Sequence, residues 1–321
     1  MKVRLKMERS TFSFWLKESV FPPAPVDTII FDVDGVLWDT GDSFDTAVQQ
    51  TVAYFLTNEY QRSAFRPVTV DELRAYRRAG GLNNDWDMTY ALLATRLAGR
   101  DDYEQAAAES GGRGRAWAET LLPEASPIDY RKIVRVFDEI YWGATDFLRC
   151  FGEAPAFVTD AAGCWHKEEQ LLPPTLLADL RTAGIRHFGI ATGRNRFELA
   201  TVLESSGLDR EIPAQAMITG DVLAKPDGRV LDRVLHNLDQ LAGNRVDNLP
   251  GPALFCGDTK DDLDAVFNYR ALKGDSARWI GAVSVVRPEE SDFFRRSGAE
   301  AVIQHVAELP ALVDSINAGR A

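Results

Sequence analysis

Short apolar runs rich in β-branched residues alternate with helical patterns over residues 172–321. An earlier run, residues 26–31, has the length and continuous apolar character of a buried parallel strand. Strands that alternate with helices predict βαβ units, and right-handed crossovers bring the ends of such strands to one edge of a sheet. The other predicted strands are residues 185–191, 253–256 and 280–286, with weaker candidates at 214–219 and 301–304. The helices predicted in this region are residues 176–183, 196–206, 230–242, 261–271 and 291–296.

Residues 42–171 have a different pattern, with helical spacing and few strand signals. We therefore predict an α/β fold: a Rossmann-like parallel sheet core with helices on both faces, built from residues 1–41 and 172–321, and an inserted α-helical domain at 42–171. Residues 1–25 form an N-terminal extension that could pack on the core or on another copy of the chain, with the core as the default expectation. The helices expected in the inserted domain are residues 43–57, 70–79, 85–97, 103–118 and 129–142.

The formal net charge of −12 argues against nucleic acid or an anionic membrane as the main partner, because both require a basic face. A local cation cluster can still bind an anionic substrate. The three cysteines form no CxxC pair and suit reduced thiols in a cytoplasmic protein. The first 20 residues lack a continuous apolar segment, so we expect neither a signal peptide nor a membrane span. The oligomeric state stays open.

Two aspartates follow the first predicted strand, in the segment FDVDGVLWDT at residues 31–40. A carboxylate such as Asp32, at the end of a strand, can attack phosphorus. A neighbouring carboxyl, Asp34, can protonate the leaving oxygen and later activate water. Gly35 permits the tight turn that carries both groups past the sheet edge. The structural alternative is a plain acidic turn.

Three further polar motifs also follow predicted strands. Thr192 and Gly193 can bind a phosphoryl oxygen at a helix N-terminus, although a threonine here can instead cap that helix. Lys225 lies in a proline-containing loop and can neutralise phosphate, or can simply be a solvated lysine. Asp258 and Asp262 offer the oxygen ligands that Mg²⁺ prefers, or acidic groups at a helix start.

These four motifs, in this order, resemble those of the haloacid dehalogenase (HAD) superfamily of aspartate-nucleophile hydrolases. The resemblance covers residues 26–41 and 172–321. It implies that Asp32 is the nucleophile and a Mg²⁺ ligand, and that Asp34 is the general acid/base with its backbone carbonyl also on the metal.

The same resemblance implies roles for the other motif residues. Thr192 and the Gly193 N–H would hold the phosphoryl group, and Lys225 would neutralise charge between nucleophile and phosphate. Asp258 would bind Mg²⁺, and Asp262 would orient the metal and its waters. The implied activity is Mg²⁺-dependent hydrolysis of a small-molecule phosphate monoester through an aspartyl-phosphate.

The placement of the helical insertion resembles the C1 cap of subfamily I, which includes phosphoglycolate phosphatase and β-phosphoglucomutase. Compared with such caps the insertion looks longer, and residues 101–126 look like an added element. A phosphomutase is therefore one alternative, and a non-catalytic phospho-ligand-binding regulator is another. Dehalogenation is disfavoured, because family members that cleave carbon–halogen bonds lack the second aspartate and need no metal.

The segment RRAGGLNNDW at residues 77–86 offers candidate substrate contacts in the inserted domain. In C1 caps the loop after the second helix reaches the site, which would bring Asn83, Asn84 and Trp86 to the substrate. Arg77 and Arg194 are further candidates. The structural alternatives are a glycine C-cap followed by an asparagine N-cap, and solvated arginines.

Overall fold

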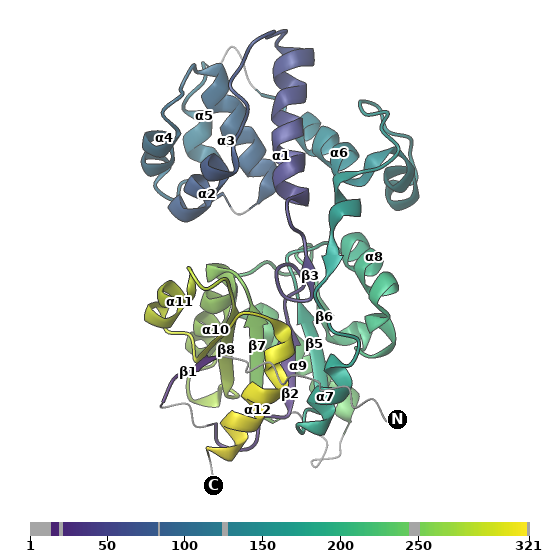
Figure 1. Ribbon diagram of the computed structural model, residues 1–321, viewed down its shortest axis with the longest axis vertical. Coiled ribbons are helices and arrows are strands. Elements are labelled where there is room, and N and C mark those ends of the chain that lie inside the picture. Colours follow the sequence, from purple (N-terminus) through teal and green to yellow (C-terminus); the bar gives the residue numbers. More distant parts are fainter. Residues whose placement is uncertain (1–13, 19–21, 83, 124–127, 244–250, 320–321) are drawn as a thin grey trace, which may run out of the picture. The chain divides into compact units, whose positions relative to one another are not determined.

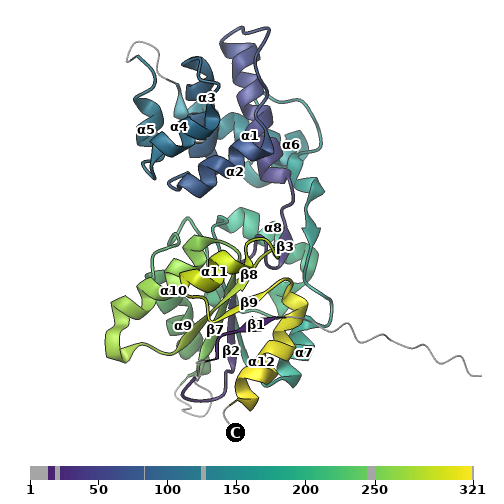
Figure 2. The same ribbon diagram turned by 60° about the vertical axis from the view of Figure 1, so that its left-hand side comes forward.

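The structure, a computed structural model, describes residues 14–18, 22–82, 84–123, 128–243 and 251–319. The chain divides into two units (Figures 1 and 2). Thr40–Glu168 form a helical unit. The described residues of Met1–Asp39 and Glu169–Ala321 form a core unit. The helical unit is thus an insertion within the core unit.

A mostly parallel sheet forms the centre of the core unit, with the strand order β1-β9-β8-β7-β2-β5-β6. Strand β2 is central, and the chain adds β5 and β6 on one side before it crosses to add β7, β8 and β9 on the other. The predicted parallel sheet is confirmed. The strands are β1 (Trp15–Leu16), β2 (Thr28–Phe31), β5 (His187–Ala191), β6 (Met217–Ile218), β7 (Ala253–Gly257), β8 (Ile280–Val285) and β9 (Ala301–Ile303).

Alternation of side chains along the buried strands explains why helices cover both faces of this sheet. In β2, Ile29 and Phe31 pack in one hydrophobic cluster, whereas Ile30 packs in another on the opposite face. The first cluster includes residues of α7 (Leu176–Thr182), α8 (Arg196–Ser206) and α12 (Leu309–Ala318). The second includes residues of α9 (Arg229–Ala242), α10 (Lys260–Lys273) and α11 (Ser291–Ser297). Helices therefore flank both faces, as predicted (Figure 1).

Strand β1 and helix α12, near the two ends of the described core unit, lie outside the predicted pattern. Strand β1 pairs antiparallel with β9, so the described part of the N-terminal extension adds an edge strand to the sheet. Two residues are too short for a periodic signal, and their extended conformation depends on the neighbouring strand. Helix α12 begins with Pro310 in its first turn, where a missing N–H costs nothing.

The helical unit contains a separate hydrophobic cluster, whose buried members lie between Ala47 and Cys164. The predicted helix at 103–118 is wrong, because positive φ angles at Gly111 and Gly114 separate two shorter helices. The predicted helix at 129–142 continues to Phe151 across a kink at Gly143. The helices are α1 (Ser43–Tyr54), which continues as a π-helix (Phe55–Glu59), α2 (Val70–Ala79), α3 (Asp85–Leu97), α4 (Tyr103–Ser110), α5 (Arg115–Glu119), α6 (Tyr130–Phe151) and a 3₁₀ helix (Cys164–Lys167).

The chain leaves and re-enters the core unit through a two-stranded antiparallel ribbon of β3 (Trp38–Asp39) and β4 (Glu169–Gln170). Among the described residues, no helix is both long and apolar enough to cross a membrane.

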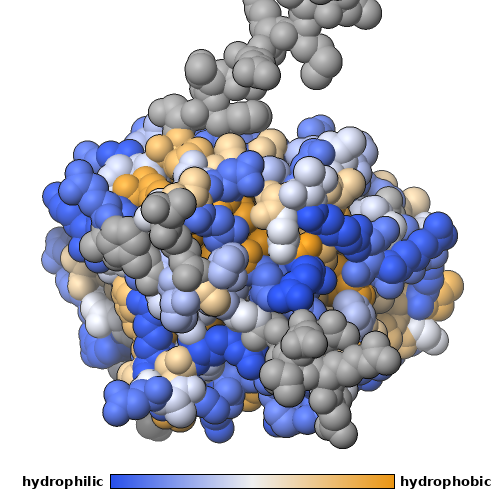
Figure 3. Space-filling view, turned by 90° about the horizontal axis from the view of Figure 1, so that it is seen from below, coloured by the Kyte–Doolittle hydropathy of each residue, from blue (hydrophilic) through white to orange (hydrophobic). Residues whose placement is uncertain are grey.

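In the face seen in Figure 3, hydrophilic residues predominate and hydrophobic residues lie between them. Cys150, Cys164 and Cys256 are all free thiols.

Candidate active site

The candidate site lies where the strand order reverses, between the central strand β2 and its neighbour β7. Phe31 and Cys256 are paired near the ends of these two parallel strands, and the Asp32 N–H continues the ladder by donating to the Cys256 carbonyl at 2.8 Å. The loops after the two strands therefore begin side by side. Such a switch point is the usual ligand site in an open α/β sheet.

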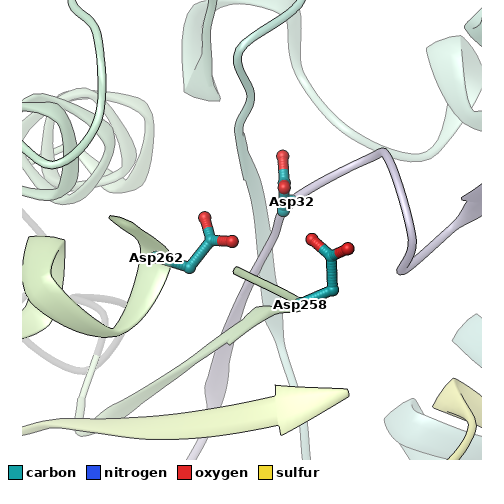
Figure 4. Close-up of side chains that lie close together, drawn as sticks. All are labelled: Asp32, Asp258 and Asp262. Atoms are coloured by element: carbon teal, nitrogen blue, oxygen red, sulfur yellow. The ribbon is translucent and has the colours of Figure 1, made fainter. Parts of the chain in front are cut away.

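Three carboxylates meet at this position (Figure 4). One oxygen each of Asp32, Asp258 and Asp262 can be chosen so that all three lie within 4.8 Å of one another. Asp32 follows β2, Asp258 follows β7, and Asp262 lies in the first turn of α10. Asp32 and Asp262 are buried. Three carboxylates at this separation form a candidate site for a divalent cation.

Local interactions constrain two of these carboxylates, those of Asp262 and Asp258. Thr259 is the N-cap of α10, and its N–H and hydroxyl donate to Asp262 Oδ2 at 2.9 and 2.6 Å. This capping box leaves Asp262 Oδ1 to face the site. Gly35, at φ 69°, approaches Asp258 so closely that a Cβ atom there would lie 2.2 Å from Asp258 Oδ2. The glycine is required both for the turn and for the space.

Lys225 connects two of the three carboxylates. Its Nζ lies 2.8 Å from Asp32 Oδ2 and 2.6 Å from Asp262 Oδ1, and its side chain is only 9% exposed. Burial by itself would lower the pKa of Lys225, but the carboxylates of Asp262 and Asp32 outweigh this effect and raise it. The lysine is therefore a permanent cation in the site, and the alternative of a solvated lysine is wrong.

Burial is only partly compensated for two of the carboxylates, those of Asp32 and Asp258. Desolvation, opposed by Lys225, raises the pKa of Asp32 to about 7. Desolvation and the neighbouring carboxylates raise the pKa of Asp258 well above its ordinary value. Asp32 Oδ1 and Asp258 Oδ1 are buried and have no hydrogen-bond partner among the described residues. A divalent cation fits this donor set, because it would satisfy both oxygens and stabilise both ionised forms.

The threonine motif lies beside these acids, at the end of β5. Thr192 is buried, and its Oγ1 accepts a hydrogen bond from the Arg194 N–H at 3.1 Å. The N-cap of the following helix α8 is Asn195, so the alternative of a capping threonine is wrong. A Cβ atom built on Gly193 would meet nothing within 4 Å, so this peptide borders open space.

Arg194 and Asp34 form an ion pair that the sequence does not reveal. The Nε and Nη2 atoms of Arg194 both lie 2.7 Å from Asp34 Oδ1. The Arg194 side chain is only 2% exposed, so the alternative of a solvated arginine is wrong. The two residues are 160 positions apart, and only the pairing of β2 with β5 brings them together.

The candidate substrate residues of the helical unit have local partners. Asn84 caps α3 through hydrogen bonds from the Trp86 and Asp87 N–H groups. The Trp86 indole N–H donates to Asp138 Oδ1 at 3.0 Å. Arg77 forms ion pairs with Asp45 at 2.6 Å and Asp85 at 3.2 Å. Each of these contacts stabilises the unit, and their contribution to substrate binding stays a prediction. Asn83 lies outside the described residues.

Thr259 is a site residue that is absent from the candidates predicted from the sequence motifs. The signal was available in the sequence, because a threonine followed three residues later by an acidic residue is a capping-box pattern. The Arg194–Asp34 pair has no such local signal, since it depends on the order of the strands.

Comparison with known proteins agrees with this architecture. Residues 26–267 match the family model of haloacid dehalogenase-like hydrolases. The match covers most of the chain, including Asp32, Thr192, Lys225 and Asp258. The chain therefore belongs to the haloacid dehalogenase-like hydrolases, and its fold and motifs are those of an enzyme of this class.

Individual solved structures that resemble this chain have low sequence identity to it. Phosphatase Tt82 from Thermococcus thioreducens is 26% identical, and its superposition covers 88% of this chain and 99% of that one with a TM-score of 0.63. A structure from the Northeast Structural Genomics Consortium is 18% identical, covers 92% of this chain and all of its own, has a TM-score of 0.62, and supports the fold alone.

One curated relative is similar in sequence. It is the imidazoleglycerol-phosphate dehydratase of Phytophthora nicotianae, 24% identical over 242 residues. That match covers 75% of this chain but 41% of the relative, so the chain spans less than half the length of that protein.

Proposed function

We propose that this protein is a Mg²⁺-dependent phosphatase that hydrolyses a small-molecule phosphate monoester through an aspartyl-phosphate. The observation that carries the proposal is the meeting of three carboxylates, those of Asp32, Asp258 and Asp262. Asp32 Oδ1 and Asp258 Oδ1 are buried without a hydrogen-bond partner among the described residues, and Lys225 contacts Asp32 Oδ2 and Asp262 Oδ1. Similarity to phosphatase Tt82 from Thermococcus thioreducens supports the same reaction class.

In this proposal, Asp32 and Asp258 hold Mg²⁺ together with the Asp34 carbonyl, and Asp262 orients the metal and its waters. The metal would stabilise negative charge that develops on the transferring phosphoryl oxygens. Lys225 balances the charge of the nucleophile and phosphate. Thr192 and the Gly193 N–H bind the phosphoryl oxygens.

The reaction has two steps. In the first, an Asp32 carboxylate oxygen forms a bond to phosphorus while the bond to the leaving oxygen breaks, and Asp34 donates a proton to that oxygen. In the second, a water oxygen bonds to phosphorus as the Asp32–phosphorus bond breaks, and Asp34 accepts the proton from water. Phosphate leaves and both aspartates return to their initial states.

The direct test is hydrolysis of p-nitrophenyl phosphate and of a metabolite panel, with and without Mg²⁺. We expect activity that EDTA abolishes and Mg²⁺ restores, and a loss of at least about 10³-fold in Asp32→Asn. Acid quench followed by peptide mass spectrometry should find a phosphoryl group on Asp32. Asp292→Asn, an exposed aspartate of the core unit, is the matched control and should be fully active.

Full activity in Asp32→Asn would rule out the proposed nucleophile. The panel should contain sugar phosphates, phosphoglycolate, nucleotides, amino-alcohol phosphates, pyrophosphate and, prompted by the curated relative, imidazoleglycerol phosphate. A phosphomutase would instead return an isomeric sugar phosphate without release of phosphate. No turnover on the whole panel would favour a phospho-ligand-binding regulator.

A further inference from the structure

We propose that Arg194 is a positioning residue that holds the Asp34 carboxylate in place for proton transfer. The inference rests on the proposed phosphatase function and concerns how that reaction obtains its acid and base. It differs from the expectation that Arg194 contacts the substrate.

Two nitrogens of Arg194 contact the same oxygen of the Asp34 carboxylate. Two nitrogens of Arg194, Nε and Nη2, lie 2.7 Å from the same oxygen of Asp34, Oδ1. Charge-assisted hydrogen bonds of this kind are about twice as strong as neutral ones. Because both donors hold Oδ1, Oδ2 is the oxygen that exchanges the proton. The Asp34 side chain is 29% exposed whereas the Arg194 side chain is buried, so the Asp34 carboxyl group remains accessible to a reacting group.

The backbone on each side of this contact is also fixed. The Arg194 N–H donates to Thr192 Oγ1, and the Arg194 carbonyl accepts from the Gly220 N–H at 2.9 Å. A Cβ atom on Gly220 would lie 2.3 Å from the Gly193 carbonyl oxygen, so the two loops are in close contact. The guanidinium therefore extends from a rigid base.

Asp34 itself lies in a hydrogen-bonded turn. The Gly35 N–H donates to the Trp38 carbonyl at 2.8 Å, and the Leu37 N–H donates to the Val33 carbonyl at 2.8 Å. These bonds fix the Cα position of Asp34 and leave its side-chain rotation as the main freedom. Arg194 removes that freedom, which is the usual requirement for a group that must transfer a proton at hydrogen-bond distance.

The two cations of the site, Lys225 and Arg194, contact different carboxylates. Lys225 contacts Asp32 and Asp262, and it makes no ion pair with Asp34. Arg194 is the cation that contacts Asp34. A lysine at position 194 would offer one nitrogen instead of two, so it would preserve the charge but not the orientation.

The proposal is tested by comparing leaving groups. The ratio kcat/KM reports the first step, in which only a basic leaving oxygen needs a proton from Asp34. We compare p-nitrophenyl phosphate, whose leaving group needs little protonation, with an alkyl phosphate that the wild-type protein hydrolyses. For Arg194→Gln and Arg194→Lys we expect kcat/KM to fall about 10²-fold on the alkyl ester and less than about threefold on the aryl ester.

The second step gives an independent readout. Because Asp34 must also accept a proton from water, kcat on p-nitrophenyl phosphate should fall in both variants and phosphoenzyme should accumulate in acid-quenched samples. Asp34→Asn should have the same profile, and the double variant should lose no more than Asp34→Asn alone, since both changes remove one function.

Arg186→Gln is the matched control. Arg186 also pairs with a buried aspartate of the core unit, Asp27, which precedes β2 at the opposite end of the strand. This variant should keep the wild-type leaving-group dependence. Thermal unfolding of each variant identifies any that fail to fold, and Arg194→Lys is the variant that retains the buried charge.

Equal losses of kcat/KM on both esters, or a rise in KM alone, would overturn the inference and assign Arg194 to substrate binding or to stability. The proposed function fails separately, if the wild-type protein hydrolyses neither ester with Mg²⁺.

Discussion

Gly35 serves both the backbone turn after β2 and the candidate metal site. Its positive φ allows the turn after β2, and its missing Cβ leaves space for the Asp258 carboxylate. Any side chain at this position would displace a candidate metal ligand. The acidic motif is easily noticed in the sequence, but the contact that makes its glycine necessary comes from the residue that follows another strand, β7.

We expect Gly35→Ala to lower both Mg²⁺ affinity and kcat by at least about tenfold, because its Cβ would lie 2.2 Å from Asp258 Oδ2. Mg²⁺ titration of activity measures both effects. Gly207→Ala is the control: Gly207 has a similar φ of 73°, but nothing lies within 4 Å of the added Cβ. It should cost about 1 kcal/mol of stability and leave activity unchanged. Equal activity in the two variants would contradict the steric argument.

The pKa values of the site predict a pH-dependent effect of Mg²⁺ on stability. Without metal, burial raises the pKa of Asp32 to about 7 and also raises that of Asp258. An aspartate in the unfolded chain ionises near its ordinary value, so the unfolded state releases protons first as the pH rises. The metal-free protein should therefore lose stability between about pH 4 and pH 7.

Mg²⁺ binds the ionised carboxylates and should reverse this loss. We expect saturating Mg²⁺ to raise Tm more at about pH 8 than at about pH 5. Calorimetry with EDTA or Mg²⁺ at each pH measures the difference. Asp258→Asn should reduce the Mg²⁺ effect at both pH values. A Mg²⁺-induced shift that is the same at both pH values in the wild-type protein would show that these carboxylates do not control binding.

At the scale of helices and strands, local patterns predict most elements because burial and capping are local properties. Helices α2, α3 and α8 have the predicted bounds, and each begins with a residue whose side chain caps it: Thr69, Asn84 and Asn195. Prediction from local patterns fails where glycine interrupts a helical pattern, as at 103–118. It also fails where an extended segment depends on a neighbouring strand, as in β1. Helix propensity alone does not reveal that a glycine will adopt a positive φ.

Asn84 allows its capping role to be separated from a role in substrate binding. Asn84→Ala should lower stability by about 1 kcal/mol, whereas Asn84→Asp should retain the cap and its stability. If capping is its only role, KM should be unchanged in Asn84→Asp. Thermal unfolding and steady-state kinetics measure the two effects. A rise in KM in Asn84→Asp at full stability would instead support the predicted substrate contact.

At the scale of the whole molecule, two hydrophobic interiors form from one chain by insertion. Over the described part of the chain, the members of the hydrophobic cluster in the helical unit all belong to that unit. Near its junction with the core unit, the Ser43 hydroxyl and the Tyr141 hydroxyl both donate to Glu168 Oε1, at 2.8 and 2.7 Å. These bonds connect α1 and α6 to Glu168, the last residue of the unit.

We expect residues 40–168 expressed alone to fold and unfold cooperatively, since the length and closed core are those of an independent domain. Conversely, Asp39 and Glu169 are directly paired in the β3–β4 ribbon, so an Asn-Gly turn between them should replace the helical unit. That shortened protein should still bind Mg²⁺, because Asp32, Asp258 and Asp262 all belong to the core unit. Circular dichroism and calorimetry with Mg²⁺ test both statements. Loss of Mg²⁺ binding would show that the metal site depends on the helical unit.

The sequence by itself determined the parallel sheet, the insertion of a helical region after the strand β2, and the polar residues at the strand ends. These features follow from short-range patterns: apolar runs that must be buried, and side chains that sit directly after them. Tertiary structure decided which of those side chains touch. Arg194 reaches Asp34, and Gly35 makes room for Asp258, because β5 and β7 pair with β2 on opposite sides. That order arises from packing between distant segments, which no local pattern encodes.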